Sequence, residues 1–457
     1  MANAGENAAE RGLGDGAIAP LFARFAVPGI ASLAFFSLQL MVNGMLLGRF
    51  AGAETLAAVN LTVPATGAMV SLCIVLNVGC QCVAGIKLGA GKGGEADDAM
   101  FTAFAATLAI SCLWGGLLGF FPESFAAFLG ASGGVLEKSA AYLEILALSF
   151  PATSLLFLAN GGLRAQGRPV FAFSAMAVAA LVNVSCAAAF VGAMGMGAAG
   201  AGYAALAASL AGLAVCLPPF FRRGAPLSVL RGRFRPRMCA QMLFNGSSEG
   251  LSELSSACAA FAFNWMMLRS AGSDGVAALT AVSSMSFAAV AFFIGLTDGG
   301  RAIISFNYGR RSRDRIVATL KLSACVLLLA GFALFSAALA FPELLASAFF
   351  SEADAKACAL ASRGAALFSA AFLAQGLNIL ASSYFTAIGD ARTSIAISLL
   401  KGFVFLGIFL AALGFAFGTD GIWLSVPCAE FSTLAVSGFL MRRALLRLGR
   451  GEWANHV

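Results

Sequence analysis

Long apolar stretches recur along this chain from Phe22 almost to its C-terminus. A bilayer core of about 30 Å requires about 20 mostly apolar residues in each helical span, and these stretches have that length. Of all residues, 60% are hydrophobic and 11% charged, whereas ordinary soluble domains carry roughly 25% charged residues. The stretches are too long and too uniformly apolar for the alternating segments of a membrane β-barrel. The sequence therefore predicts an all-α integral membrane protein with many spans.

Twelve transmembrane helices are expected. The segment before them, up to Ala19, contains Glu6, Glu10 and Asp15 and lacks a basic leader followed by a short apolar core, so no removable signal peptide is expected. The predicted spans are 20–47, 57–84, 97–121, 139–163, 170–193, 201–221, 239–267, 276–304, 316–341, 361–386, 393–417 and 421–442.

The basic residues are distributed unevenly among the predicted loops. The loops after even-numbered helices and the C-terminal tail contain most of the 29 lysines and arginines, whereas the opposite side receives few: Arg49, Lys138, Arg269, Lys356 and Arg363. By the positive-inside rule, both termini are expected in the cytoplasm of a prokaryotic cell. The net charge of +7 is explained by this topology, and no nucleic-acid partner is expected.

The chain is internally duplicated. An offset of 220 residues aligns residues 51–58 with 271–278, and Gly89 with Gly309. The predicted domains are a six-helix lobe at 1–223, a basic cytoplasmic linker at 224–237 and a second six-helix lobe at 238–457. Because each repeat has an even number of spans, the two lobes enter the membrane in the same orientation. Such parallel repeats are typical of transporters, in which substrate is handled in a central cleft between the halves.

Short motifs occur in a fixed order along both halves. They are Val42-Asn43-Gly44-Met45-Leu46-Leu47-Gly48-Arg49, Leu88-Gly89-Ala90-Gly91, Gln166-Gly167-Arg168-Pro169, Leu181-Val182-Asn183, Ser305-Phe306-Asn307-Tyr308-Gly309 and Ala387-Ile388-Gly389-Asp390. In these motifs and their spacing the chain resembles the multidrug and toxic compound extrusion family. The resemblance implies a V-shaped bundle of two six-helix lobes that exports amphipathic, often cationic compounds in exchange for protons or sodium ions.

The chain also departs from that family. The family often has an aspartate where this chain has Asn43, and another where it has Ala187. Where the family commonly has Gln-Pro after the glycines of helix 8, this chain has Arg301-Ala302. A carboxylate site in the N-terminal lobe is therefore missing, and the coupling chemistry is expected in the C-terminal lobe.

Charged residues inside the predicted spans are concentrated in the C-terminal half. Each costs at least about 2.5–3.5 kcal/mol at the centre of a membrane helix, so each is a candidate functional residue. Glu144 is the exception in the N-terminal half. The candidates for ion coupling and substrate binding are Glu249, Glu253, Asp298, Arg301, Lys401 and Glu430.

Glu249 and Glu253 are four residues apart and share one helical face. Three interpretations remain open. One glutamate carries the coupling proton, or both supply oxygens to a sodium ion, or each pairs with Arg301 or Lys401 and only holds helices together. Asp298 and Arg301 are expected to form a pair within one helix.

Neutral polar and adaptable apolar residues are expected to line the substrate cavity. The polar candidates are Gln39, Asn43, Asn183, Asn264 and Asn378. The apolar candidates are Phe35, Phe36, Met41, Met45, Met69, Phe157, Met176, Phe261, Met266, Met285, Phe287 and Phe292, since methionines and aromatic residues suit promiscuous binding.

Other classes of function find little support. The single histidine, His456, lies at the C-terminal end, no GxxxxGK[ST] phosphate loop is present, and no pair of cysteines has CxxC spacing. An enzyme and a resident cofactor are therefore not expected. The main hypothesis is a multidrug antiporter acting as a monomer among membrane lipids, and the alternative is a flippase for a lipid-linked precursor. A flippase for pyrophosphate lipids is expected to place several basic residues in its cleft, whereas acids outnumber bases within these spans.

Overall fold

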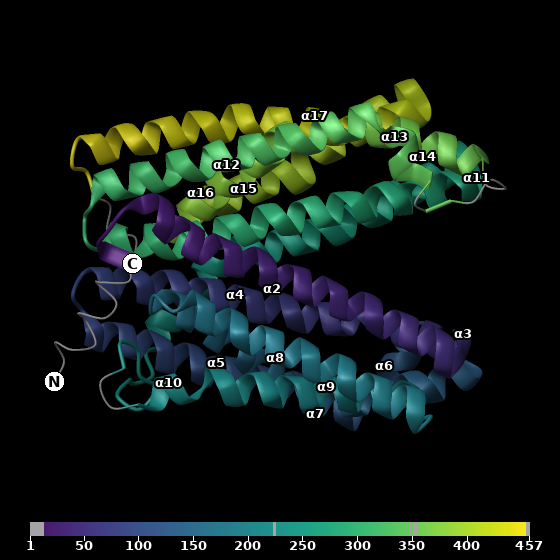
Figure 1. Ribbon diagram of the computed structural model, residues 1–457, viewed down its shortest axis with the longest axis horizontal. Helices are drawn as coiled ribbons and strands as arrows, with labels where there is room; N and C mark the ends of the chain where they lie inside the picture. Colours follow the sequence, from purple (N-terminus) through teal and green to yellow (C-terminus); the bar gives the residue numbers. More distant parts are fainter. Residues whose placement is uncertain (1–12, 223–224, 348, 351–354, 454–457) are drawn as a thin grey trace. The chain divides into compact units, whose positions relative to one another are not determined.

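The computed structural model describes residues 13–222, 225–347, 349–350 and 355–453. Within these ranges the regular secondary structure is helical throughout, with short π-helical segments (Figure 1). Glu6, Glu10, Arg223 and His456 lie outside the described residues. The fold class predicted from the sequence, an all-α membrane protein, is confirmed.

Among the described residues, nine helices are long and apolar enough to cross a membrane, or ten if one bent pair is counted as a single span. The longest, α11 (Pro236–Gly309), has 74 residues. At 1.5 Å per residue it would extend about 110 Å as one rod, several times the thickness of a bilayer core. A non-helical glycine divides it at Gly272, and Gly418 likewise divides α17 (Leu406–Gly449). Counting both as two spans is consistent with twelve.

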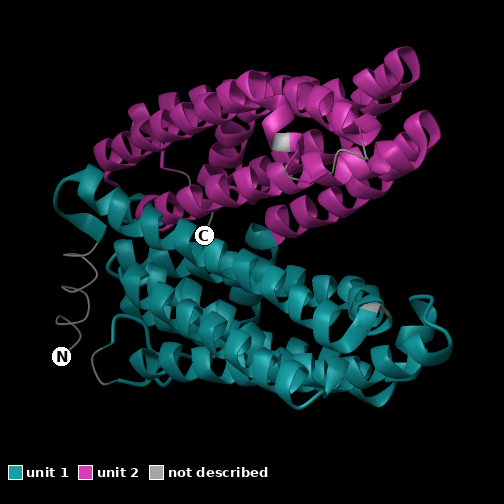
Figure 2. Cartoon of the chain, turned by 45° about the vertical axis from the view of Figure 1, so that its right-hand side comes forward, with its two compact units in different colours: residues 1–246, 305–310, 457 teal, residues 247–304, 311–456 magenta. Residues whose placement is uncertain are grey.

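The chain forms two compact units (Figure 2). Unit 1 comprises residues 1–246, 305–310 and 457. It contains both ends of α11 together with α2 (Ile18–Leu46), η2 (Leu47–Ala51), α3 (Gly52–Leu61), α4 (Val63–Gly89), α5 (Gly93–Phe120), α6 (Pro122–Phe128), α7 (Gly133–Ala165), α8 (Pro169–Ala187), η3 (Ala188–Ala193), α9 (Gly197–Cys216) and α10 (Pro218–Phe221).

Glycines allow helices of unit 1 to approach to backbone contact. A methyl group on Gly79 of α4 would meet the Met242 carbonyl oxygen at the start of α11, and one on Gly246 would meet the Val75 carbonyl oxygen. Because lipid provides no hydrophobic force between helices, such close packing at small residues is a main source of their association. The first residues of α11 are thereby fixed against α4.

Unit 2 comprises residues 247–304 and 311–456. Besides the middle of α11 it contains α12 (Arg313–Ala340), α13 (Pro342–Ser347), α14 (Ala355–Ser369), α15 (Phe372–Ala387), α16 (Ala391–Leu399), η5 (Leu400–Phe405) and α17. Its core includes Trp423, which is 2% exposed and lies beside Gly364, where a larger side chain would meet the indole.

The offset of 220 residues recurs in the elements of the two halves. The 28-residue helix α5 begins at Gly93, and α12, of the same length, begins at Arg313. An exposed ion pair joins Glu54 to Lys138 in unit 1 at 2.7 Å. The corresponding pair in unit 2 joins Asp274 to Lys356 at 3.1 Å. The same segments therefore occupy the same structural positions in each half.

The span predicted at 361–386 is not one straight helix, because α14 and α15 meet at 52°. The amide of Ala371 donates to the Phe368 carbonyl and that of Ala374 to Ala371, so the helix tightens locally to three-residue spacing, which bends it. The helices α6 and α13 were not expected either. Each begins with a proline, Pro122 or Pro342, a residue favoured in the first turn of a helix.

Candidate functional site

The charged candidates all lie in unit 2. The middle of α11 carries Glu249, Glu253, Asp298 and Arg301 on the two sides of Gly272. The remaining two candidates are Lys401 in η5 and Glu430 in α17.

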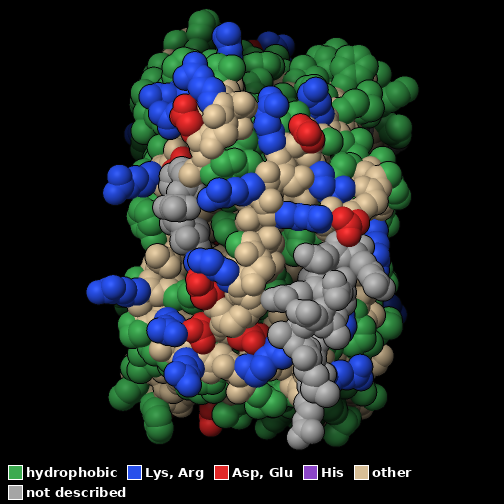
Figure 3. Space-filling view, turned by 90° about the vertical axis from the view of Figure 1, so that its left-hand side faces the viewer, with side chains coloured by type: hydrophobic (Ala, Val, Ile, Leu, Met, Phe, Trp, Pro, Cys, Tyr) green, Lys and Arg blue, Asp and Glu red, His purple; other side chains and the backbone are tan. Residues whose placement is uncertain are grey.

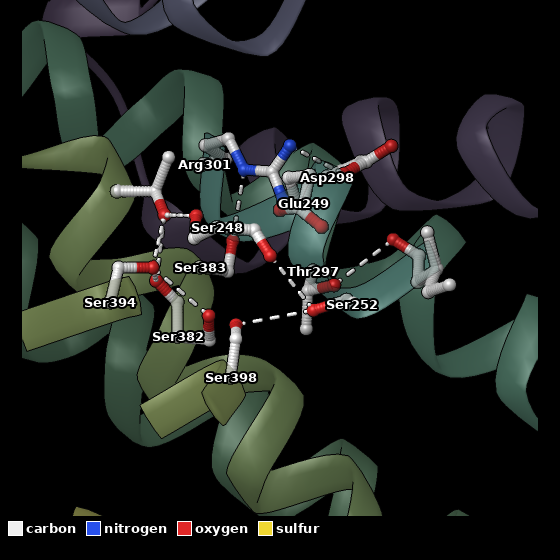
Figure 4. A network of polar contacts seen from close by, with 12 residues as sticks. Ser248, Glu249, Ser252, Thr297, Asp298, Arg301, Ser382, Ser383, Ser394 and Ser398 are labelled. Atoms are coloured by element: carbon white, nitrogen blue, oxygen red, sulfur yellow. Dashed lines mark hydrogen bonds and ion pairs between the residues drawn. The ribbon is translucent and has the colours of Figure 1, made fainter. Parts of the chain in front are cut away.

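Arg301 is the centre of the first charged cluster (Figure 4). Its Nη2 lies 2.5 Å from Glu249 Oε1, its Nη1 lies 3.1 Å from Asp298 Oδ1, and its Nε donates to Ser383 Oγ at 3.1 Å. The guanidinium is 4% exposed, and a buried charge is tolerated only when it is paired and hydrogen-bonded. The planar fork of arginine satisfies three partners in three directions, which a lysine ammonium does not reproduce.

Glu253 lies one helical turn after Glu249 but differs from it in its contacts. Its side chain is exposed at the protein surface, and within the described part of the chain it forms no hydrogen bond or ion pair. Its charge is instead felt by Glu249. Of the four acidic candidates, Glu253 is thus the one that no cation neutralises within the described residues.

Lys401 and Glu430 form the second charged cluster. Lys401 Nζ lies 3.0 Å from Glu430 Oε1. Asn378 of α15 donates to Glu430 Oε2 at 2.7 Å and to the Glu430 carbonyl oxygen at 2.8 Å, and it accepts a hydrogen bond from Ser437 at 2.8 Å. Both oxygens of this buried carboxylate are therefore engaged, which suits a fixed structural charge.

A network of hydroxyl groups adjoins the Arg301 cluster and was missed by the sequence analysis (Figure 4). Ser248 lies 3.2 Å from Thr386, which lies 2.7 Å from Ser394, and Ser252 donates to Ser398 at 3.1 Å. The network connects α11, α15 and α16. The signal that could have revealed it is the four-residue spacing of Ser248 with Ser252 and of Ser394 with Ser398, which places each pair on one helical face.

The neutral candidates of the N-terminal half come together in unit 1. Asn43 donates to Asn183 Oδ1 at 2.7 Å. Asn183 and Gln39 line a cavity of about 200 Å³ enclosed by α2, α4, α7, α8 and α9. Of the apolar candidates, Phe36, Met69, Phe157 and Met176 line the same cavity.

Other predicted cavity residues do not line this cavity. Asn264 is exposed and donates to the carbonyl of Ala260 in its own helix. Several apolar candidates are exposed on the protein surface: Met41, Met45, Phe261 and Phe287.

The structure bears on the sodium interpretation through charge. Within the described residues, no group of three or more His, Cys, Asp or Glu side chains is arranged to hold a metal ion. Because Arg301 lies 2.5 Å from Glu249, a cation bound directly to Glu249 would be repelled by the guanidinium. Glu253 carries no such neighbour among the described residues.

The linker between the halves is fixed to unit 1. Asp97 at the start of α5 accepts from the Ser228 amide at 2.6 Å and from Arg231 Nε at 2.7 Å. Asp98 accepts from the Arg233 amide at 2.7 Å and from Arg235 Nε at 2.9 Å. Backbone and side chain are thus held together by two adjacent carboxylates.

Comparison with known proteins gives a consistent result. The family model MatE matches residues 28–189 and 250–418, more than half of the chain. Among curated proteins, none matches it in sequence.

Several solved structures share the fold. One is a MATE solved in complex with MaL6, with a TM-score of 0.90, 19% identity, and coverage of 98% of this chain and 99% of that one. Another is an outward-facing multidrug resistance MATE transporter of the MOP superfamily, with a TM-score of 0.85, 20% identity, and coverage of 94% and 96%. A third is a MOP superfamily transporter from Pyrococcus furiosus Vc1, described by a reverse polarity of its binding pocket, with a TM-score of 0.86, 20% identity, and coverage of 97% and 98%.

Proposed function

This chain belongs to the MatE family of membrane transporters, and from that premise we propose that it is a secondary active multidrug exporter. It exchanges small amphipathic organic cations for protons or sodium ions by alternating access. It acts as a monomer in a prokaryotic cytoplasmic membrane, with both termini in the cytoplasm and no cofactor besides the coupling ion. The arginine-rich loops support this orientation, and Figure 3 shows a face on which Lys and Arg side chains gather.

The observation that carries the proposal is the contrast between Glu253 and the other acidic residues of unit 2. Glu249 and Asp298 share Arg301, and Glu430 is paired with Lys401. Glu253 is exposed and has no cationic partner in the described part of the chain. An ionised carboxylate at membrane depth is costly without a counter-ion, so an external cation is the natural partner of this group.

Coupling then follows from competition for one carboxylate. Ionised Glu253 attracts an organic cation, whereas a proton or a sodium ion at the same group cancels its charge and releases the drug. The negative charge of Glu249 one turn away adds to the field at Glu253, and Arg301 holds Glu249 in place. A ligand shifts a conformational equilibrium only by its differential affinity for the two states, and the charge of Glu253 provides that difference.

The test is efflux of a fluorescent organic cation from proteoliposomes under separately imposed proton and sodium gradients. The wild-type protein is expected to export the dye under at least one gradient. Glu253→Gln is expected to insert and fold but to lose gradient-driven efflux, whereas Glu144→Gln, which alters an exposed carboxylate in unit 1, retains it. If Glu253→Gln transports at the wild-type rate with unchanged ion dependence, the coupling site lies elsewhere. If neither gradient drives efflux in the wild type, the antiport proposal is wrong.

A further inference from the structure

The unit 1 cavity contains no charged side chain among the described residues that line it. Its titratable groups are Tyr142 and Cys73, whose phenol and thiol ordinarily have pKa values of about 10 and about 8.5 and are neutral at physiological pH. Asn43, the nearest member of the predicted set outside the lining, is also neutral. An organic cation would therefore leave water without gaining a counter-ion, which is unfavourable.

The cavity nevertheless presents groups that can hydrogen-bond a ligand. Asn183 is 1% exposed, and its Oδ1 accepts from Asn43, while its Nδ2 has no partner within the described residues. Gln39 and Tyr142 also line the cavity and form no hydrogen bond through their side chains in the described structure. A buried amide without a partner is uncommon in folded proteins, so these groups are available to a bound molecule.

The hydroxyl groups of the cavity add acceptors. Ser149, Thr153, Ser154 and Ser209 each donate to a carbonyl oxygen of their own helix, at distances from 2.6 to 3.0 Å. Because a hydroxyl that has donated its proton retains lone pairs, these oxygens can accept from a ligand. The lining therefore offers both donors and acceptors without net charge.

The apolar walls set the shape and size of the ligand. Phe36 and Phe157 meet edge to face with ring centroids 6.5 Å apart, and Met69 and Met176 complete the wall. The volume is about 200 Å³. A cavity of about 150 Å³ accommodates benzene, whereas drug-sized ligands occupy roughly 300–1,000 Å³. One or two fused rings fit this space.

We infer that the unit 1 cavity binds uncharged aromatic compounds of one or two rings that carry hydrogen-bonding oxygen atoms, and that it binds them independently of the coupling ion. This inference rests on the proposed transport function, since it gives the exporter a neutral substrate site separate from the carboxylates of unit 2. Unit 1 then selects by shape and hydrogen bonding, and unit 2 by charge.

The experiment is isothermal titration calorimetry of the full chain in nanodiscs with two probes of similar size. Coumarin is neutral and accepts hydrogen bonds, whereas N-methylquinolinium is cationic. Coumarin is expected to bind the wild type with an affinity that does not change between mildly acidic and mildly alkaline pH, or on addition of sodium. Asn183→Leu is expected to weaken coumarin binding about tenfold, the scale of one lost hydrogen bond in a buried site. Asn60→Leu, which alters an exposed amide of α3 outside the cavity, is expected to leave the affinity unchanged.

A second substitution tests the role of charge. Asn183→Asp is expected to bind N-methylquinolinium at least about tenfold more tightly than the wild type at alkaline pH, because it places a carboxylate at the cavity wall. Gln39→Leu replaces Asn183→Leu if the latter fails to fold by size-exclusion chromatography. The inference is overturned if coumarin does not bind at millimolar concentration, if it binds equally well to both cavity variants, or if wild-type protein binds the cation in the site as tightly as coumarin. Such a result leaves the Glu253 efflux test unaffected, so the two proposals fail separately.

Discussion

Lys401 Nζ lies 3.0 Å from Glu430 Oε1, and the carboxylate it neutralises is 3% exposed. Two donors from Asn378 occupy the remaining acceptor positions of Glu430. The group is buried more deeply than Glu249 or Glu253 and has no access to an external ion. Its contribution is therefore to the packing of η5 and α15 against α17.

Lys401→Met is expected to destabilise the protein strongly, because it leaves the Glu430 charge buried and uncompensated. Breaking a buried pair from one side costs about 3–5 kcal/mol. Adding Glu430→Gln to Lys401→Met is expected to restore most of the loss. The free energy of unfolding can be measured by dodecyl sulfate titration in mixed micelles. Equal destabilisation in the single and double variants would contradict the structural role of the pair.

Arg301→Lys is expected to be a damaging change although it conserves charge. The guanidinium contacts Glu249, Asp298 and Ser383 through three different nitrogens, and a single ammonium cannot reach all three. A loss of about 1–3 kcal/mol is expected for each buried group left unsatisfied. The same titration measures it, with Arg313→Lys, at an exposed position of α12, as the matched control. A loss no larger than that of the control would show that the three contacts are dispensable.

Asp97→Ala is expected to release the linker from α5. The carboxylate holds the Ser228 amide and the Arg231 side chain at 2.6 and 2.7 Å, and without it the segment opens more often. Limited trypsin digestion followed by mass spectrometry is expected to show cleavage after Arg231 at least about tenfold faster, which corresponds to about 1.4 kcal/mol of lost local stability. Asp314→Ala, at an exposed position in the first turn of α12, is expected to leave the rate unchanged. Unchanged cleavage in Asp97→Ala would show that other contacts hold the linker.

Gly79→Ala and Gly67→Ala are expected to have opposite effects within the same helix. A methyl group at position 79 would meet the Met242 backbone, whereas one at position 67 meets no atom within 4 Å. The first substitution forces α4 and α11 apart and is expected to cost about 1–3 kcal/mol. The second removes a helix-interior glycine and is expected to stabilise by up to about 1 kcal/mol. Thermal unfolding in detergent distinguishes them, and a neutral Gly79→Ala would contradict the close approach.

Much of the fold could be predicted from the sequence because lipid imposes simple rules on a chain. The length of the apolar stretches indicated the helices, and the 220-residue offset anticipated the equal lengths of α5 and α12. The breaks were less accessible. Gly272 was assigned to a loop between spans, whereas the helical pattern continues up to it on both sides and the backbone reverses at that single residue.

The candidate site was only partly predictable for a related reason. Charge at membrane depth is rare, so the six ionisable candidates stood out from their composition alone. Which of them pair depends on the crossing of α11, α15 and α17, which sequence spacing does not encode. The hydroxyl network was missed because serine is common in helices and satisfies itself by bonding to its own backbone. Its side-chain contacts, such as Thr386 with Ser394, appear only when the helices are packed.

The neutral Asn43–Asn183 pair also has a consequence for the electrical behaviour of the transporter. A membrane potential of 100 mV acts on one elementary charge with about 2.3 kcal/mol when that charge crosses the full field. The residues described as lining the unit 1 cavity carry no charge, so voltage does little work on them when that cavity changes its exposure. The charged clusters around Arg301 and Lys401, together with Glu253, all belong to unit 2. The voltage dependence of transport is therefore expected to originate in unit 2, while ligand occupancy of the unit 1 cavity is electrically silent.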